Sequence, residues 1–290
     1  MWRRDASGNF SVPTADQREG DFSAYPVTIY DPMTGTEPRN RQPFAGNKIP
    51  LARQSPIIRK VQASLPLPNL SGTLDNYAAL GNNSFDRDNY DLKVNWNPSP
   101  QHAMFGKYSQ MNAFVGGTVA LGDAGGPALG PKGNGPIGYT KVPIATVGHT
   151  WTISPSFLID GTFGFNRYDQ PVVGPDHGKN WGTEVWGIPG SNEPTGPGAA
   201  EVIKRCPATG CYSGQPRINH GYTFWGNGDS WMPQFRSDRS YIVNTNAGRI
   251  FRAHEMRWGF DMARHHMDHW QPEGQCLPRV EGHDGVGGDG

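Results

Sequence analysis

The chain has 290 residues, of which 35% are hydrophobic, and its mean hydropathy of -0.62 is low for a protein that buries a large core. With 39 Gly and 26 Pro residues, much of it is expected to form turns and loops. The 26 Lys and Arg residues balance the 26 Asp and Glu residues, so the charge indicates no nucleic-acid partner. No apolar run approaches the roughly 20 residues that a spanning helix needs, so a membrane protein of this sequence has to be a β-barrel.

Residues 1–87 are predicted to be a long, irregular, extracellular loop region with one short helix. Turn-forming residues crowd this range. Its first residues are basic but lack the apolar run of a signal peptide, which leaves either a cytosolic chain or one whose true N-terminus lies upstream. The helix is expected over Pro56–Ser64, because Ser55 can cap it and proline fits the first helical position.

A first hairpin is predicted over residues 89–111. Up to Trp96, apolar and polar residues alternate with a period of two, and the apolar ones are Tyr90, Leu92, Val94 and Trp96. A tight turn is expected at residues 97–100, followed by a return strand over residues 102–111. On that strand Met104, Gly106 and Tyr108 share one face.

Residues 142–167 form the clearest hairpin of the sequence, folded about Ser154-Pro155-Ser156. One face of its second strand carries Phe157, Ile159, Gly161, Phe163 and Phe165. On the first strand the matching set is Ala145, Val147, Trp151 and Ile153, with His149 as the one polar member. A pair with one apolar and one polar face suits either the outside of a soluble core or the lipid-facing wall of an outer-membrane barrel.

A third hairpin is predicted near the end of the chain, over residues 241–263. Its first strand alternates with the same period, and its second places Met256, Trp258, Phe260 and Met262 on one face. The connection between them is expected around residues 252–254. The polar face of all three hairpins repeatedly carries Asn, Asp, Lys and Arg.

The lengths of the connections favour a membrane barrel. Turns within the hairpins are short, whereas residues 112–141 and 168–239 separate one hairpin from the next. Long structureless loops are uncommon in compact soluble domains, but long outer loops and short turns at the other end are typical of outer-membrane barrels. Aromatic residues at the strand ends suit the interfacial girdles of such a barrel: Trp96, Tyr108, Trp151, Tyr168, Tyr241 and Trp270.

An ordered series of motifs over most of residues 12–268 resembles the Oar-like TonB-dependent receptors of Acidobacteria and Myxobacteria. The series runs Gly20-Asp21-Phe22-Ser23, Ile29-Tyr30-Asp31-Pro32-Met33-Thr34-Gly35, Phe44-Ala45-Gly46-Asn47-Lys48-Ile49-Pro50, Leu65-Pro66-Leu67-Pro68-Asn69, Asp88-Asn89-Tyr90-Asp91-Leu92-Lys93-Val94-Asn95 and Met104-Phe105-Gly106-Lys107-Tyr108-Ser109. In the last hairpin Arg252-Ala253 precedes His254, where that family usually has Gly-Lys. The order of the motifs is specific, whereas no single motif would be.

The resemblance implies a receptor in the outer membrane of a Gram-negative bacterium that binds and imports an unidentified extracellular ligand. Such a receptor contacts outer-membrane lipid and, through a plug domain that is not recognisable here, the TonB complex. A complete barrel of this class has about 22 strands, whereas the pattern gives about six. We therefore expect an all-β antiparallel meander of up-and-down hairpins with long irregular loops, as an internal piece of a large transmembrane barrel. Residues 88–270 would form this piece, and residues 271–290 a loop or disordered tail.

Several candidate site residues lie in the longest loop. Cys206 and Cys211 are predicted to form a disulfide, because an extracellular loop is oxidising; free thiols or a metal site are the alternatives, and Cys276 is left over. Four tryptophans among Gly, Asn and Pro are candidate ligand contacts: Trp181, Trp186, Trp225 and Trp231.

His265 and His269 would share a strand face, which permits a metal interpretation. Alternate strand residues are roughly 6.5 Å apart and no fourth ligand is specified, so a polar rim is favoured and no metal is predicted. The sequence has no Gly-x-Ser-x-Gly, phosphate-binding or His-Glu-x-x-His motif, and we predict no catalytic residue and no cofactor. The alternative is a secreted, soluble β-sandwich or propeller that binds or hydrolyses glycans through these tryptophans and a carboxylate pair.

Overall fold

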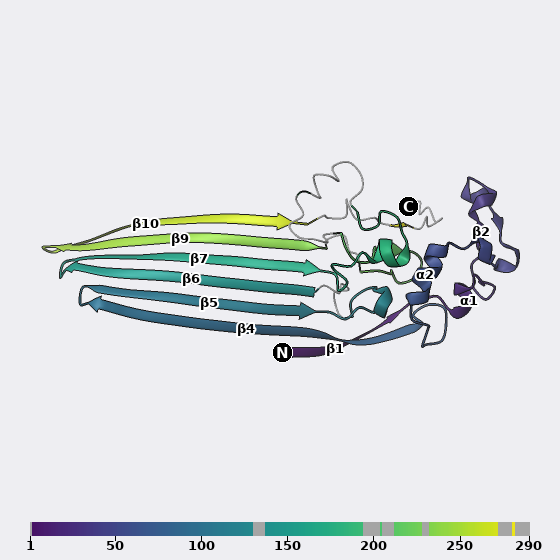
Figure 1. The fold of residues 1–290 in the computed structure, drawn as a ribbon, viewed down its shortest axis with the longest axis horizontal. Coiled ribbons are helices and arrows are strands. Elements are labelled where there is room, and N and C mark those ends of the chain that lie inside the picture. The colour runs from purple at the N-terminus through teal and green to yellow at the C-terminus, as the bar shows by residue number, and fades with distance from the viewer. Residues whose placement is uncertain are drawn as a thin grey trace.

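The computed structural model describes residues 2–129, 137–193, 204, 212–227, 232–271 and 280–281. Within them, one antiparallel sheet of seven strands has the order β1-β4-β5-β6-β7-β9-β10. From β4 onward it is an up-and-down meander of long strands lying side by side (Figure 1). The strands are β1 (Trp2–Phe10), β4 (Tyr77–Ser99), β5 (His102–Gly116), β6 (Ile137–Ser154), β7 (Phe157–Val173), β9 (Gln234–Phe251) and β10 (His254–Trp270).

The strand register confirms the predicted alternation and joins the three hairpins into one surface. Apolar residues of successive strands lie opposite one another, so one side of the sheet carries a continuous band of apolar side chains. This side is called the apolar face. One row across it reads Val94, Gly106, Val147, Phe163, Val243 and Met262. The opposite side, the polar face, has the matching row Asn95, Phe105, Gly148, Thr162, Asn244 and Asp261.

Nothing in the described part of the chain packs on the apolar face. Val94 is 57% exposed, Val147 55% and Trp258 53%. A β-sandwich would bury such a face against a second sheet, whereas the buried hydrophobic cluster of the described residues lies in the connections between the strands, apart from Ala79 at the start of β4. The soluble sandwich or propeller is therefore the wrong interpretation of this alternation.

All three hairpin turns lie at one end of the sheet (Figure 1). β6 and β7 are joined by Pro155 and Ser156, and β9 and β10 by Arg252 and Ala253, as predicted. The first turn differs from the prediction, because β4 continues to Ser99 after a register shift that follows Trp96. Pro98 lacks the N–H of a regular ladder, and the irregularity accommodates it.

At the other end of the sheet, the long connections fold together into a cap, defined here as residues 11–76, 117–129, 174–193 and 212–227 (Figure 1). No helix in the described ranges is long and apolar enough to cross a membrane. The cap contains α1 (Ala15–Arg18), α2 (Pro56–Ser64), η1 (Pro32–Thr34), η2 (Pro38–Asn40), η3 (Ala45–Asn47), η4 (Leu51–Arg53), η5 (Gly122–Ala124), η6 (Trp181–Trp186), β2 (Tyr30–Asp31), β3 (Gln42–Pro43) and β8 (Ile218–Asn219), the last paired with β11 (Val280–Glu281).

The cap has a hydrophobic core to which all three connections contribute. Its buried residues are Val12, Val61, Leu65, Ala79, Ala120, Leu121, Ala124, Leu129, Trp186, Ile218 and Trp225. Buried Asn76 donates to Val12 O and accepts from Val12 N, both at 2.9 Å, which closes the first connection. Gly226 N donates to Ala124 O at 2.7 Å and so joins the second connection to the third.

The first 87 residues contain more regular structure than predicted. Helix α2 and its Ser55 cap are as expected. In contrast, β1 pairs with the first residues of β4, which begins at Tyr77, and a helix of four residues follows Thr14. Residues 2–10 have weak strand propensity, so their conformation depends on the partner strand. The division of the chain into domains at residues 88 and 271 stays a prediction.

Candidate functional site

The polar face of the long strands carries a network of hydrogen-bonding side chains. On β4 and β5, Ser109 Oγ donates to Asp91 at 2.5 Å, and Lys107 Nζ lies 3.6 Å from the same carboxylate. Because both charge signs occur side by side, this part of the face can bind polar groups without selecting an anion or a cation.

A second network crosses β7, β9 and β10 on the same face. Asn246 Nδ2 donates to Asp160 at 3.0 Å and also approaches Asn244 Oδ1 at 2.9 Å. Asn244 in turn donates to Asp261. Three adjacent strands thus present amides and carboxylates in fixed positions, as expected for a surface that hydrogen-bonds a polar solute or an opposing protein surface.

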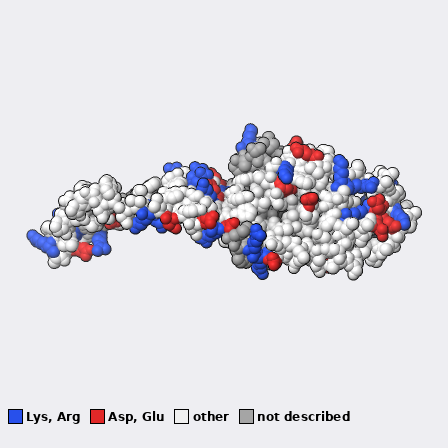
Figure 2. Space-filling view, turned by 60° about the horizontal axis from the view of Figure 1, so that its bottom comes forward, with Lys and Arg blue, Asp and Glu red and all other residues white. Residues whose placement is uncertain are grey.

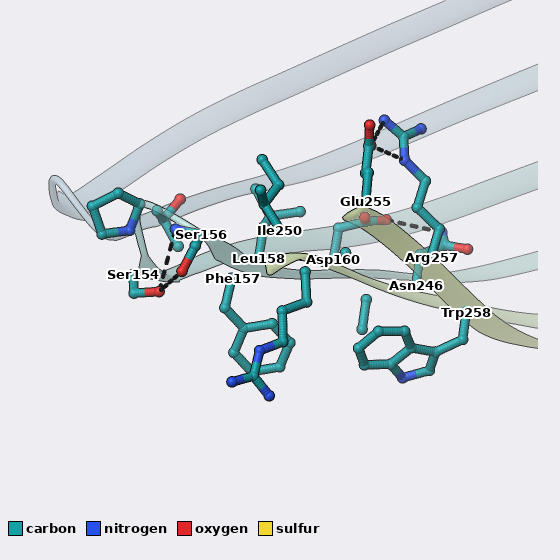
Figure 3. Close-up of a pocket in the computed structure, with 15 residues that line it drawn as sticks. Ser154, Ser156, Phe157, Leu158, Asp160, Asn246, Ile250, Glu255, Arg257 and Trp258 are labelled. Atoms are coloured by element: carbon teal, nitrogen blue, oxygen red, sulfur yellow. Dashed lines mark hydrogen bonds and ion pairs between the residues drawn. The ribbon is translucent and has the colours of Figure 1, made fainter. Parts of the chain in front are cut away.

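A hollow of about 810 Å³ surrounds the turn end of β6, β7, β9 and β10. Figure 3 shows that its lining comes from both sides of the sheet: Leu158 and Ile250 point away from Phe157 and Trp258. Arg257 and Glu255 pair with each other at 2.6 Å within it. Since a single layer of strands separates the two halves, the hollow is not one enclosed binding cavity.

The structure brings two of the four candidate tryptophans together in the cap core. Trp186 is 1% exposed and Trp225 3%, so their rings are unavailable to a ligand in this conformation. Trp181, at the start of η6, is half-buried. Trp231, Cys206, Cys211 and Cys276 lie outside the described residues.

Sequence reasoning missed a buried polar group that joins two parts of the cap. The Asp176 carboxylate accepts from Gln215 N at 2.6 Å, and Gln215 Nε2 donates to Asp123 O at 2.5 Å. Burial raises the pKa of the Asp176 carboxyl, while hydrogen bonds from Asn227 and Gln215 oppose the rise. Burial also lowers the pKa of the neighbouring His177. No sequence motif marks these residues, because they meet only after the loop folds.

The histidines near the end of β10 are separated by the strand geometry. His265 and His269 lie on the polar face and His266 on the other. His265 Nδ1 contacts Ser240 Oγ at 2.8 Å, and His269 Nε2 contacts Gln271 Oε1 at 2.9 Å. Among the described residues, no group of three or more His, Cys, Asp or Glu side chains is arranged to hold a metal ion.

Two of the predicted girdle aromatics are not where an interfacial girdle needs them. Tyr168 is on the polar face beneath Arg236, and Trp270 contacts Tyr212 of the cap. The other four do border the apolar band. Trp96 and Trp151 lie at its turn end, Tyr108 and Tyr241 at its cap end. Proximity to a strand end therefore predicts neither the face that an aromatic residue occupies, as for Tyr168, nor its distance from the band, as for Trp270.

Comparison with known proteins gives one match, which spans almost the whole chain. A family model described as an outer membrane beta barrel domain matches residues 1–285. No curated protein and no solved structure matches the chain significantly.

Proposed function

The chain belongs to the outer membrane beta barrel family and is located in the outer membrane of a Gram-negative bacterium, and we propose that it is part of a receptor. This receptor binds an extracellular ligand and imports it with energy from the TonB complex. Members of this family are typically non-enzymatic, and we propose no catalytic role for any residue here. The ordered motifs that resemble the Oar-like receptors support the finer assignment.

The orientation of the sheet follows from the rules for outer-membrane barrels. Short turns lie on the periplasmic side and long loops outside the cell, so the cap is extracellular. The apolar face then meets lipid and the polar face lines the lumen. On β7 the band from Phe157 to Phe165 covers about 27 Å along the strand, or roughly 19–22 Å after a tilt of about 35–45°, which is close to the apolar height of about 25 Å in such barrels.

A larger barrel is required to complete this wall. Seven strands form an open sheet in the described structure, with β1 and β10 at its edges. A sheet that spans a membrane has to be closed, because unpaired backbone groups are too costly in lipid. We propose that further strands of the same receptor pair with these edges.

The folded cap is the main support for a receptor rather than a simple pore. Its connections share one hydrophobic core and buried hydrogen bonds, so they hold a fixed surface above the lumen. We propose as ligand contacts Trp181 of the cap and Trp231, which lies outside the described residues, whereas buried Trp186 and Trp225 hold the cap together. We also propose that a Cys206–Cys211 disulfide restrains the same loop. Siderophore, glycan, peptide and signal-molecule ligands all fit this arrangement.

Uptake by whole cells tests this function. A strain with the intact receptor and its deletion mutant are given labelled ferric siderophores, oligosaccharides and peptides in turn. We expect the deletion to abolish accumulation of one class, and a protonophore to stop accumulation in the intact strain while surface binding persists. Uptake that continues with the protonophore would indicate a passive pore, and unchanged uptake of every probe would remove the transport assignment.

A further inference from the structure

Four cationic side chains form a belt on the lipid-facing side of the sheet. They are Lys141 on β6, Arg167 on β7, Arg239 on β9 and Arg264 on β10, and together they are called the basic belt. Arg167 and Arg239 lie opposite each other in the register, one row beyond Phe165 and Tyr241 toward the cap. Arg264 lies in the row of Tyr241 itself. The belt therefore borders the extracellular edge of the apolar band.

The basic belt is only partly neutralised within the protein. Arg167 pairs with Asp169 at 2.8 Å, and Arg239 lies 3.3 Å from Asp268. Neither Lys141 nor Arg264 has an ion pair or a side-chain hydrogen bond within the described ranges. Four cations and two carboxylates leave a formal charge of +2. Figure 2 shows Lys and Arg side chains, with Asp and Glu side chains among them, where the slender sheet meets the wider cap.

The two paired arginines stay accessible from outside the protein. The side chains of Arg167 and Arg239 are each 43% exposed, although both lie beside a carboxylate. Neighbouring strands are about 4.8 Å apart, so four adjacent strands spread the belt over roughly 15 Å. A phosphate group matches an arginine fork in charge and geometry. The aromatic rings of Phe165 and Tyr241, whose centroids are 5.3 Å apart, lie one row from Arg167 and Arg239, on the side toward the middle of the apolar band.

We propose that the basic belt binds the phosphorylated sugar headgroup of lipopolysaccharide in the outer leaflet. The belt lies at the level of the headgroups, faces away from the lumen, and offers several cations to an anionic lipid surface. The aromatic pair packs against the sugar and the first part of the acyl chains. This inference concerns the lipid around the barrel, and it does not depend on the imported ligand.

The opposite end of the same strand supplies a matched control. Arg249 is also on the lipid-facing side of β9, opposite Phe157 and Met256, but it lies at the periplasmic end of the apolar band. It can reach the inner leaflet and not the outer one. Arg249→Gln therefore removes the same charge from the same face without touching the proposed site.

The test uses the full-length receptor in lipid nanodiscs of phosphatidylethanolamine and phosphatidylglycerol, titrated with bis-phosphorylated lipid A or with lipid A that lacks both phosphates. We expect Arg167→Gln and Arg239→Gln each to weaken binding of the phosphorylated form about fivefold, and the double variant about 25-fold. Arg264 makes no ion pair or side-chain hydrogen bond within the described ranges, and Arg264→Gln should weaken binding of phosphorylated lipid A by a similar factor. This variant takes the place of the double variant if the double variant does not fold.

The controls separate phosphate recognition from general lipid contact. Arg249→Gln should bind as the wild type does, and lipid A without phosphates should bind the wild type and the belt variants equally weakly. The proposal is overturned if belt variants retain full affinity, if Arg249→Gln weakens binding equally, or if dephosphorylated lipid A binds the wild type as tightly as the phosphorylated form.

Discussion

Gly148 on the polar face shows how one residue can be required by its neighbour on the next strand. The ring of Phe105 lies over it, and a Cβ at position 148 would come within 2.1 Å of that ring. Lys93 Nζ lies 5.0 Å from the centroid of the same ring. The ring thus covers the exposed backbone of a strand glycine, while a cation covers the ring.

We predict that Gly148→Ala destabilises the barrel by about 1–3 kcal/mol, because Phe105 has to leave its position. Urea unfolding in lipid vesicles, followed by tryptophan emission, measures this cost. Gly106→Ala is the control, since a Cβ there meets no atom within 4 Å, and it should be neutral or slightly stabilising. Combining Gly148→Ala with Phe105→Leu should restore much of the loss. Equal effects at both glycines would contradict this account.

Asp176 gives the cap a pH dependence whose sign follows from burial. Burial raises the pKa of the Asp176 carboxyl in the folded state above its ordinary value of 3.8, so folding favours the protonated acid. The stabilising contribution of this group is therefore complete only when the pH is below 3.8. That contribution declines as pH rises through the raised folded-state value. His177 has the opposite effect: its pKa is lowered, so stability declines as pH falls from the ordinary 6.5 through the lowered value.

We predict that Asp176→Asn removes the first of these two trends and leaves the second. The emission of buried Trp186 and Trp225 reports cap opening during urea titration, and cap stability is compared at pH 4, 5, 6 and 7. The wild type should lose stability relative to the variant as pH rises across this series. A difference between the proteins that is constant with pH would show that the carboxyl does not titrate with folding.

Arg18 acts at the scale of the element, because it attaches α1 to the end of α2. Its guanidinium donates to Gln62 O at 3.1 Å, Leu65 O at 3.0 Å and Pro66 O at 2.5 Å. These carbonyls lie at or just beyond the C-terminus of α2, where a cation is favoured by the helix dipole.

We expect Arg18→Met to destabilise the cap by about 1.5–3 kcal/mol, since the apolar stem is retained and the charged hydrogen bonds are lost. The same fluorescence titration of the cap measures the effect. Arg59→Met is the matched control on α2, where the arginine is exposed and makes no side-chain hydrogen bond or ion pair within the described ranges, and it should change stability by less than about 0.5 kcal/mol. Similar losses in both variants would exclude the attachment.

The elements differ in how well the sequence predicts them. Faces of strands follow from a period of two, which is local, so Val94 and Phe163 could be assigned to one side without a structure. Strand length was underestimated: β4 extends 12 residues before Asn89, where alternation is weak and pairing with β1 and β5 holds the strand. For α1, the capping box of Thr14 and Gln17 is a signal that can be recognised in the sequence alone.

At the scale of the whole molecule, the cap was the least predictable part. It depends on contacts between residues far apart in sequence, such as Asn76 with Val12 and Gln215 with Asp123. The composition and the turn-forming residues of these segments indicate only that they lack long helices and strands. Burial of Trp186 and Trp225 is a consequence of that assembly, so their position in a loop sequence predicts exposure where the folded cap buries them.

In the proposed barrel, the apolar face meets lipid while the polar face lines the lumen. Arginine is placed singly at Val94 and Phe163 in the full-length receptor, with the adjacent polar-face positions Asn95 and Thr162 as controls. Folding into lipid vesicles and urea unfolding give the cost of each. We predict a loss of about 2–4 kcal/mol at Val94 and Phe163 and little change at the controls. Equal stability of all four variants in the membrane would contradict the assignment of the two faces.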